Sequence, residues 1–592
     1  MIKTLSKYIL ASAAIAVVGC SDFLDKDNPA YDNVGFYKSE AGLKEGVTGT
    51  YQKLYFDMNW AVPACIVLDH YTAYGLEQDE NKSIGAGGAL NPDNVKIQAF
   101  WSGEYGIIAR ANSVIAGAES SIETMSDKAK QYYAEARVLR AYAYYNLISA
   151  YGDVPFFTAP VTIEQYKEGR TPKGEIIDFL TKDLNDAANS LPWTATERGR
   201  VDKSVAYGLI SRICLFAGSF NVDNKGQDYF RQAAEAASKV IGKRHLAKKF
   251  DDLFNLTGQA KSDVRDECLW ELMYSTSGSK KLHTVGYGHS SRNYGSSVRF
   301  PSSIIADTYE CIDGKRIDES PLYDPKHPTK NRDPRFNATL AGHMDTVYYT
   351  NTDGNNPLKC VINIYDSKTS FYPRRNKWYT ANNVDVTGTS PSLVNNGVGY
   401  VWRKYANETT EQLMSSSSNL ILMRYAEILL NYAEAKIELG ELDESVYNAI
   451  NEIRKRAGMP EVSADRIGNV DKMRQLVRRE RKVEFVLEGL LFVDVRRWGI
   501  GDLLNEHPSY GQPLPEIRYE GLADTDIPSF KTSATTSTTF RRMKPTRRNS
   551  AYATRTDSGL RNSLGGQFLA SRPTATRILP TLTINRNYRI LQ

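Results

Sequence analysis

Residues 129–155 read Ala-Lys-Gln-Tyr-Tyr-Ala-Glu-Ala-Arg-Val-Leu-Arg-Ala-Tyr-Ala-Tyr-Tyr-Asn-Leu-Ile-Ser-Ala-Tyr-Gly-Asp-Val-Pro, and this stretch indicates the kind of fold that the chain adopts. Small and aliphatic side chains recur in it every three or four residues, as they do on one face of an α-helix. The residues of this stripe are Ala136, Leu139, Ala143 and Leu147. Gly152 and Pro155 end the pattern. The stretch therefore predicts a long helix that ends near Tyr151.

Other segments of the chain carry the same helical patterning. We expect helices over about 203–216, 228–241, 421–439, 443–457 and 470–488. Helices of about 15 residues that are paired across short glycine-containing turns have the dimensions of tetratricopeptide repeats. The last helix carries Arg478-Arg479-Glu480-Arg481, which we place on its exposed side as a solvated or inter-helix ionic network.

Two stretches lack helical patterning. Gly, Pro, Ser, Asn and Tyr dominate residues 245–415, where short strands such as 399–405 alternate with long loops, and residues 55–100 are similar. Loops of this length in a compact domain are usually functional. The sequence predicts a mostly α fold in which a scaffold of tetratricopeptide-like helix pairs (about 101–241 and 420–498) carries a large loop-rich surface with a few short strands.

The N-terminus resembles an export signal. Lys3 and Lys7 precede an apolar run that is too short to span a bilayer, and small residues lead to Cys20. A cysteine at the cleavage point is typical of a bacterial lipoprotein, so we predict that residues 1–19 are removed and that Cys20 carries lipid. An ordinary signal peptide with a chance cysteine is the alternative.

The charge of the chain is unevenly distributed. Residues 531–592 contain ten Arg and two Lys against Asp557 alone, so the overall charge of +5 leaves residues 20–530 acidic. The basic segment is rich in Ser and Thr and has no regular period. It is either a basic interaction arm or a disordered tail, or it is a sequence read out of frame from about residue 531. Few aromatic residues accompany the charge, and we expect no nucleic-acid partner.

Residue types that signal catalysis or cofactor binding are not found in recognisable patterns. The five cysteines after Cys20 are odd in number and form no CxxC pair, which argues against a disulfide framework and a zinc site. The chain has no HExxH, GxSxG or P-loop motif. We therefore expect neither a metal nor a cofactor, and no enzymatic activity. A pair of carboxylates that cleaves glycosidic bonds remains an open alternative.

Several blocks, taken in order, resemble the SusD/RagB family of outer-membrane nutrient-binding lipoproteins. They are Cys20-Ser-Asp-Phe-Leu-Asp25, Trp101-x-x-x-Tyr105-x-x-Ile108-x-x-Ala111-Asn112, Glu135–Tyr145 with Tyr151-Gly-Asp-Val-Pro155, Asn331-Arg-Asp-Pro-Arg335, Leu422-Met-Arg-Tyr-Ala-Glu427 with Asn431-Tyr-Ala-Glu-Ala435, and Arg478-Arg-Glu-Arg-Lys482 with Phe492-Val-Asp-Val-Arg-Arg-Trp498. The resemblance covers residues 20–530 as a single domain. The Trp-Pro-Ile-Pro-like block that usually ends the family is missing, which favours the frameshift hypothesis.

The resemblance implies a surface lipoprotein held in the outer membrane by the lipid on Cys20. Such proteins capture glycan fragments, or less often peptides, and lie as a lid over a TonB-dependent (SusC-like) transporter to which they deliver the ligand. They perform no bond chemistry. The charged residues of the blocks, such as Arg424, Glu427 and Glu434, are interpreted as structural ion pairs or caps.

The aromatic residues of the loops are the candidates for ligand binding, because sugar C–H faces stack on aromatic rings while sugar hydroxyls need fixed polar partners. The candidates are Trp60, Tyr71, Tyr74, Tyr294, Trp378 and Tyr379 for stacking, with Asp69, Asn81, Arg374 and Arg375 for polar contacts. For each one, packing within the protein is the competing interpretation. A surface glycosidase or peptidase, and an adaptor that binds only a protein partner, are the alternative functions.

Overall fold

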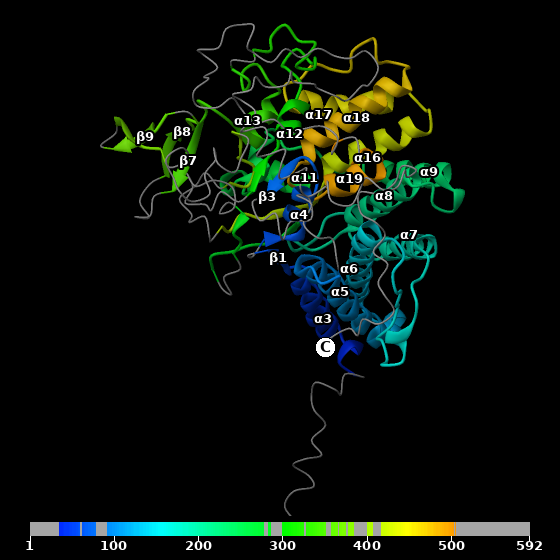
Figure 1. The fold of residues 1–592 in the computed structure, drawn as a ribbon. Coiled ribbons are helices and arrows are strands. Elements are labelled where there is room, and N and C mark those ends of the chain that lie inside the picture. Colours follow the sequence, from blue (N-terminus) through cyan, green and yellow to red (C-terminus); the bar gives the residue numbers. More distant parts are fainter. Residues whose placement is uncertain are drawn as a thin grey trace, which may run out of the picture.

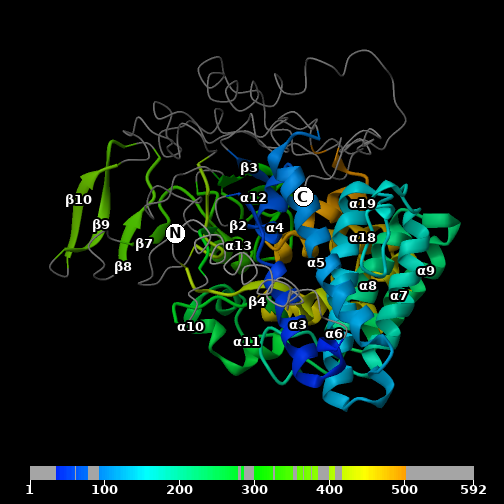
Figure 2. The ribbon, with the colours of Figure 1, turned by 90° about the horizontal axis from the view of Figure 1, so that it is seen from below.

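The computed structural model is a mainly helical protein with a small β-sheet on the side opposite to helices α7–α9 (Figures 1 and 2). It describes residues 35–59, 62–77, 92–277, 282–285, 299–324, 327–350, 357–364, 366–374, 377–383, 399–406, 416–501 and 504. The prediction of a mostly α fold with a few short strands is confirmed. Cys20 and the basic segment 531–592 lie outside the described residues, as do the ends of the single domain proposed for 20–530.

The helices form two groups along the chain, separated by most of the strands. The α-helices are α3 (Glu40–Lys53), α4 (Ala64–Val67), α5 (Val95–Glu119), α6 (Asp127–Tyr151), α7 (Lys173–Asn189), α8 (Lys203–Ser219), α9 (Gly226–Ser238), α10 (Leu256–Gln259), α11 (Ser262–Glu267), α12 (Ser303–Thr308), α13 (Pro334–Thr339), α16 (Tyr425–Glu438), α17 (Glu444–Arg456), α18 (Val470–Phe485) and α19 (Leu491–Arg497). The strands are β1 (Asp57–Asn59), β2 (Val62–Pro63), β3 (Gly75–Glu77), β4 (Cys268–Leu272), β5 (Arg299–Pro301), β6 (Leu340–Ala341), β7 (Thr346–Thr350), β8 (Pro357–Val361), β9 (Lys368–Arg374), β10 (Lys377–Asn382), β11 (Val401–Trp402) and β12 (Leu420–Arg424).

Helix α6 is the long helix that the sequence predicts. The hydroxyl of Ser126 caps its N-terminus by accepting a hydrogen bond from the N–H of Ala129 at 3.1 Å. Gly152 ends it with a φ of 80°, a conformation that favours glycine. The predicted stripe is fully buried and consists of Ala136, Leu139, Ala143 and Leu147. α6 packs against α5 on one side and α7 on the other.

Successive helices pack side by side to make the scaffold. The pairs α5–α6, α6–α7, α7–α8 and α8–α9 are in contact along the first group, and α16 contacts both α17 and α18 in the second. Helix α9 packs on α16, which joins the two groups into one layer of helices (Figure 1). Within the described part of the chain, no helix is both long and apolar enough to cross a bilayer.

One predicted helix begins later than its sequence pattern suggested. The prediction of a helix from 421 is wrong for its first four residues, because Leu420–Arg424 form strand β12, which pairs with β4. All five residues of β12 are buried. A short apolar run that is buried on both faces looks the same in sequence whether it is a strand or a helix. The helix itself, α16, begins at Tyr425.

The strands form one larger sheet and several two-stranded pairs. The larger sheet has the antiparallel order β10-β9-β8-β7 and projects from the body on the side away from the helical scaffold (Figure 2). The strand expected over 399–405 is limited to β11, Val401–Trp402. Gly399 and Tyr405 have positive φ values of 90° and 58°, which interrupt the extended backbone on either side.

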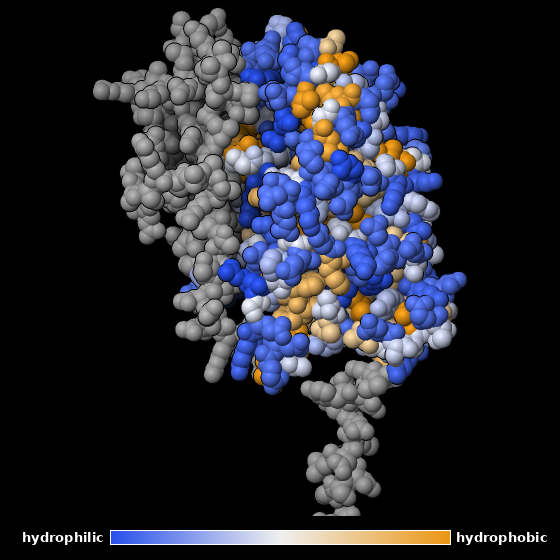
Figure 3. Space-filling view, turned by 90° about the vertical axis from the view of Figure 1, so that its right-hand side faces the viewer, coloured by the Kyte–Doolittle hydropathy of each residue, from blue (hydrophilic) through white to orange (hydrophobic). Residues whose placement is uncertain are grey.

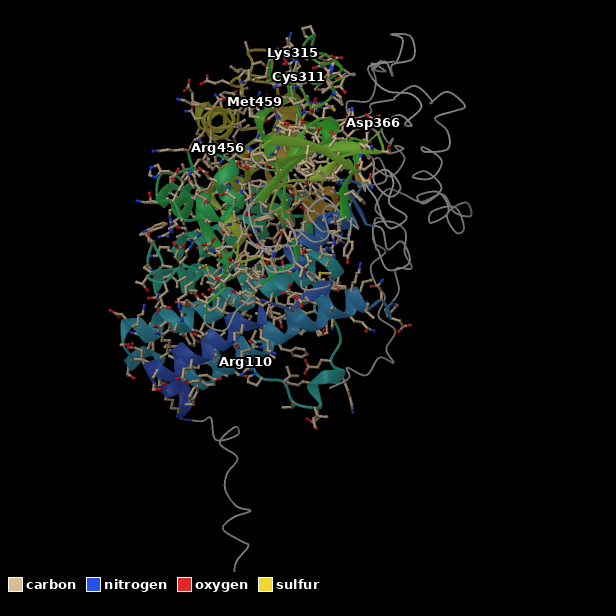
Figure 4. The ribbon with its side chains drawn as sticks, turned by 90° about the vertical axis from the view of Figure 1, so that its left-hand side faces the viewer. Arg110, Cys311, Lys315, Asp366, Arg456 and Met459 are labelled. Atoms are coloured by element: carbon tan, nitrogen blue, oxygen red, sulfur yellow. The ribbon has the colours of Figure 1, made fainter. Side chains whose placement is uncertain are left out.

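A buried cluster of ion pairs surrounds Glu484 on α18. Its Oε2 accepts a hydrogen bond from Nη1 of Arg335 at 2.9 Å. Its Oε1 accepts from Nη1 of Arg424 at 2.6 Å and also from Nη2 of Arg456. The guanidinium groups come from α13, from the end of β12 and from the end of α17, where Figure 4 labels Arg456. A single carboxylate therefore ties three elements to α18.

The charged block of α18 does not lie on the solvent side as expected. The prediction of exposure is wrong for Glu480 and Arg481, which are buried, whereas its alternative, an inter-helix network, is confirmed. Arg478 and Arg479 are partly buried and pair with Glu438 and Glu310. Helices α12, α13 and α16 cover this face of α18. Charge alone did not reveal which face of the helix other elements would cover.

The charged residues of the family blocks on the other helices form structural ion pairs, as the sequence suggested. Glu135 accepts a hydrogen bond from Arg200 at 2.8 Å, and Arg140 donates to Asp183 at 2.8 Å. Arg212 pairs with Glu427 at 2.6 Å, and Arg497 pairs with Glu434 at 2.7 Å. Further pairs of this kind are Arg137–Asp183 and Arg481–Asp494.

We predict that Glu484→Gln destabilises the fold by about 3–5 kcal/mol, because three buried guanidinium groups lose the charge that compensates them. The free energy of unfolding is measured by urea denaturation. Asp228→Asn is the matched control, since the Arg231–Asp228 pair is exposed and is expected to contribute less than about 1 kcal/mol. A cost no larger than that of the control would contradict the central role of Glu484.

The same variant should change how stability depends on pH. Burial by itself raises the pKa of Glu484, but the charges of Arg456, Arg424 and Arg335 outweigh burial and hold this pKa far below its usual 4.5. A carboxyl group whose pKa is lowered by folding stabilises the folded state fully at any pH above its pKa in the unfolded chain. This stabilisation is lost as the pH falls below that value. The difference between the wild type and Glu484→Gln should therefore stay constant down to about pH 4.5 and shrink below it.

Candidate functional site

The ten residues proposed from sequence as ligand contacts fall into three groups. Trp60, Asn81, Tyr294 and Arg375 lie outside the described residues, and so does the side chain of Arg374, whose backbone ends β9. Asp69, Tyr71 and Tyr74 are buried in the body of the protein. Trp378 and Tyr379 lie next to each other in β10 of the projecting sheet.

Asp69 connects the first loop region to the second group of helices. Its carboxylate accepts hydrogen bonds from the backbone N–H groups of Glu488, Gly489 and Phe492 at 3.1–3.2 Å. Burial raises the pKa of Asp69 to about 7, although these N–H donors act in the opposite direction. The carboxylate is 2% exposed and fully engaged with the backbone after α18. It has no surface to offer a ligand and is a structural residue here.

Tyr71 and Tyr74 belong to the hydrophobic core rather than to a binding surface. They are 5% and 1% exposed, and neither leaves a ring face on which a sugar could stack. The sequence pointed to them because they lie in an aromatic-rich loop region. Their position in the core depends on packing against distant segments, such as the one that Asp69 binds. The structure thus places this part of the proposed site inside the protein.

Trp378 is held in an exposed position by an irregularity in the β9–β10 hairpin. Lys377 pairs with Arg374 and Tyr379 pairs with Phe371, so Tyr372 and Pro373 together oppose Trp378. Two residues opposite one make a β-bulge, which re-aims the side chains around it, and a proline lacks the N–H that a regular ladder needs. The indole is 49% exposed.

One face of the hairpin is consistently exposed. Trp378, Thr380 and Asn382 are exposed along β10, whereas the intervening Tyr379 and Ala381 are half-buried. Alternate residues of a strand point to the same face, and directly paired residues share it. The partners on β9 are Ser370, opposite Thr380, and Lys368, opposite Asn382. We name these five residues, Trp378, Thr380, Asn382, Ser370 and Lys368, the hairpin face.

Polar contacts fix the end of the hairpin to the turn that precedes β9. The side-chain amide of Asn383 donates hydrogen bonds to the carbonyl oxygens of Asn363 and Asp366, the latter at 2.7 Å. The side chains of Asn363 and Asp366 are themselves joined at 2.9 Å. Figure 4 labels Asp366 beside the strands of the sheet. The hairpin face is therefore presented on a braced element rather than on an isolated loop.

Sequence reasoning identified Trp378 and Tyr379 but missed the other members of the hairpin face. No period-two signal is evident in Lys377-Trp-Tyr-Thr-Ala-Asn382, because its first four residues are all large or polar. The positions of Ser370 and Lys368 follow only once the register of the two strands is known. An aromatic ring, a hydroxyl, an amide and an amine on one face suit a polyhydroxylated ligand better than an apolar one.

A groove of about 710 Å³ lies elsewhere, between α3 and α5. Small residues of α5 form its floor, and Lys38, Lys53 and Arg110 line its sides. Figure 4 labels Arg110 on these helices, far from Asp366 and the sheet. None of the residues proposed from sequence lines this groove.

No set of three His, Cys, Asp or Glu side chains that could hold a metal ion occurs among the described residues. Cys65, Cys214, Cys268 and Cys311 are buried and unpaired, and Cys360 is buried as well. Burial raises the pKa of the Cys65 thiol to about 12, which makes it unreactive.

Two family models match the chain. One, described as the SusD family, matches residues 266–563, and the other, described as "Starch-binding associating with outer membrane", matches residues 22–215. The chain belongs to the SusD family. The first match extends past residue 530, so this SusD-family protein retains family similarity into its basic segment.

Relatives of this SusD-family protein are of similar length and low identity. SusD-like protein P2 of Formosa agariphila is 25% identical over 518 residues, which are 82% of this chain and 89% of that protein. The starch-binding protein SusD of Bacteroides thetaiotaomicron is 24% identical over 405 residues, 62% of this chain and 64% of its own. The crystal structure of a SusD-like carbohydrate binding protein from Bacteroides fragilis matches with a TM-score of 0.67 at 23% identity, and the match covers 89% of this chain and 99% of that one.

The structural roles of Asp69 and Tyr74 in this SusD-family protein can be tested by substitution. Asp69→Ala should lower the free energy of unfolding by about 3 kcal/mol, because three buried N–H groups lose their acceptor. Tyr74→Phe should change it by less than about 1 kcal/mol, because the Tyr74 hydroxyl is buried without a hydrogen-bond partner among the described residues. Urea denaturation measures both. Equal effects of the two substitutions would contradict these assignments.

Proposed function

We propose that this protein is a surface lipoprotein that captures glycan fragments and delivers them to a partner TonB-dependent transporter of the SusC type, over which it lies as a lid. The observation that carries the capture role is the hairpin face, in which Trp378 is 49% exposed beside Thr380 and Asn382. The lipid on Cys20 is the proposed anchor in the outer membrane. No bond chemistry is assigned to the protein.

The hairpin face has the chemistry that glycan binding requires. A flat indole offers a large contact area to the C–H face of a sugar ring at little cost in conformational entropy. The hydroxyls of Thr380 and Ser370 and the amide of Asn382 can exchange hydrogen bonds with sugar hydroxyls. Because the hairpin is braced at Asn383, these groups keep their spacing before a ligand arrives.

The comparisons support a carbohydrate as ligand class. The Bacteroides fragilis structure is named as a SusD-like carbohydrate binding protein, and the Bacteroides thetaiotaomicron relative is named as a starch-binding protein. The model that matches residues 22–215 is described as associating with the outer membrane. These names support the ligand class and the location proposed here.

A peptide ligand is the second candidate, and one observation favours it. Strand β10 is an outer strand in the order of the projecting sheet. Extended peptides bind to such strands by adding a further strand through main-chain hydrogen bonds. Binding of this kind would depend on the backbone of β10 more than on the side chain of Trp378.

The capture role is tested with the full mature chain and a panel of neutral oligosaccharides and peptides, using isothermal titration calorimetry. For the glycan that binds best, Trp378→Ala should weaken the affinity about tenfold, which corresponds to the loss of one aromatic stacking contact. Phe36→Ala is the matched control, because it removes another exposed aromatic side chain, which lies just before α3 and outside the hairpin face.

Other outcomes separate the candidates. Binding to peptides alone, insensitive to Trp378→Ala, would replace glycan with peptide as the ligand. Equal losses in Trp378→Ala and Phe36→Ala would remove the hairpin face from the site. Turnover of a bound oligosaccharide would show a surface glycosidase and overturn the assignment of a purely binding protein.

The delivery role has a separate readout. The native lipoprotein, solubilised from outer membranes in mild detergent, should co-purify with a TonB-dependent barrel protein that mass spectrometry identifies. Binding of glycan without any such partner would leave the capture role and contradict the lid.

A further inference from the structure

A second surface with aromatic and cationic side chains lies on the helical scaffold. Trp193, in the connection between α7 and α8, is 37% exposed. Its ring centroid is 6.1 Å from that of Tyr207, which lies one turn into α8. Helices α7–α9 occupy the side of the molecule opposite to the projecting sheet in both ribbon views (Figures 1 and 2). This surface is therefore separate from the hairpin face.

Three lysines are gathered on these two rings. The Nζ atoms of Lys203 and Lys243 each lie 5.6 Å from the ring centroid of Trp193, and Nζ of Lys239 lies 4.5 Å from that of Tyr207. At these distances the face of an aromatic ring attracts an ammonium group. We name these five residues, Trp193, Tyr207, Lys203, Lys239 and Lys243, the lysine–aromatic patch.

The ammonium groups of the patch have no carboxylate partner among the described residues. Other exposed lysines do have such partners. Lys225 pairs with Asp178, Lys261 pairs with Asp252 and Lys472 pairs with Asp465, all within 3.1 Å. The positive charge of the patch is therefore available to a ligand in a way that the charge of those lysines is not.

Two of the acidic residues near the patch, Asp202 and Glu197, are already engaged. Asp202, next to Lys203, is buried, pairs with Arg244 and caps α8 by accepting from the N–H of Val205. Glu197 pairs with Arg200 and Lys44.

The backbone under the patch is fixed by the same residues. Arg244 donates a hydrogen bond to the carbonyl oxygen of Trp193 at 3.0 Å, and the N–H of Lys203 donates to the carbonyl oxygen of Pro192 at 2.8 Å. These contacts thus fix the backbone beneath the patch, and they leave its lysines without a carboxylate partner in the described part of the chain.

We propose that the lysine–aromatic patch is a second binding site, and that its ligand is an anionic saccharide, a sugar that carries sulfate or carboxylate groups. The rings of Trp193 and Tyr207 offer contact to the C–H face of a sugar, and the ammonium groups beside them bind its anionic substituent. Figure 3 shows that the side of the molecule with α7–α9 is mainly hydrophilic. This site goes beyond the capture of glycan on the hairpin face and does not depend on it.

A saccharide fits the patch better than an acidic peptide does. Patch residues lie at the start of α8, at and beyond the end of α9, and in the connection before α8. Main-chain hydrogen bonds of helices are satisfied internally, so these elements provide no strand edge to which an extended peptide could pair. The patch therefore offers a ligand ammonium charges and aromatic ring faces.

The test compares dextran sulfate with dextran of the same length by isothermal titration calorimetry, using the full mature chain. We expect the triple variant Lys203→Ala, Lys239→Ala, Lys243→Ala to bind dextran sulfate at least tenfold more weakly than the wild type. The control triple variant Lys225→Ala, Lys261→Ala, Lys472→Ala removes the same charge from paired lysines and should lose no more than twofold. The control triple variant is needed because the basic segment 531–592 can also attract dextran sulfate, and both triple variants retain that segment.

Two single variants test the aromatic part of the site. Trp193→Ala should weaken the binding of dextran sulfate about fivefold or more, whereas Trp378→Ala should leave it unchanged. Thermal unfolding checks that all variants are folded.

Several results would overturn the proposal. Equal losses in the two triple variants would mean that only net charge matters. Equal binding of unsulfated dextran would remove the anionic group from recognition. Binding of poly-glutamate as tight as that of dextran sulfate, and equally sensitive to the lysine substitutions, would replace the saccharide with an acidic peptide. None of these results affects the test of Trp378→Ala with neutral glycans. The proposal of a second site can therefore fail while the capture role stands.

Discussion

The buried carboxylate of Glu484 is the contact on which most of the architecture depends. A charge that has been removed from water is tolerated only if its partners stay in place, and here the partners are Arg335, Arg424 and Arg456. These arginines lie far apart in the sequence, so the ionic cluster can form only when α13, β12, α17 and α18 are all correctly positioned. Apolar packing fills the space between helices, whereas the ionic cluster specifies which helices meet.

The ionic cluster also reaches the base of the projecting sheet. Lys404 donates a hydrogen bond to Glu488 at 2.6 Å, and Glu488 in turn binds Arg424. The neighbouring Arg403 donates to the carbonyl oxygen of Thr346, the first residue of β7, at 3.1 Å. A series of hydrogen bonds, with the peptide bond between Arg403 and Lys404 as one link, thus connects the interior of the helical scaffold to the sheet that carries Trp378. The hairpin face therefore belongs to a sheet that polar contacts attach to the scaffold.

Some of this structure could be read from the sequence, and the reason differs from residue to residue. Helix α6 was predictable because its stripe, its Ser126 cap and its terminal Gly152 are all local signals. The start of α16 was not, because a doubly buried strand and a helix share the same apolar pattern around Ile421. Tyr74 and Trp378 were equally plausible ligand contacts in the sequence. Distant packing buries the first and strand register exposes the second, and neither is visible in the neighbouring residues.

The register of the β9–β10 hairpin separates two sets of residues with different constraints. Tyr379 and Ala381 are half-buried, whereas Trp378, Thr380 and Asn382 are exposed and contribute less to folding. Substitutions at the outward positions can accumulate without disturbing the scaffold or the series of hydrogen bonds that supports it. A lineage of such proteins could therefore diverge in what it recognises by exchanging a handful of side chains on alternate positions of one strand, while selection for stability continues to act on the rest of the molecule.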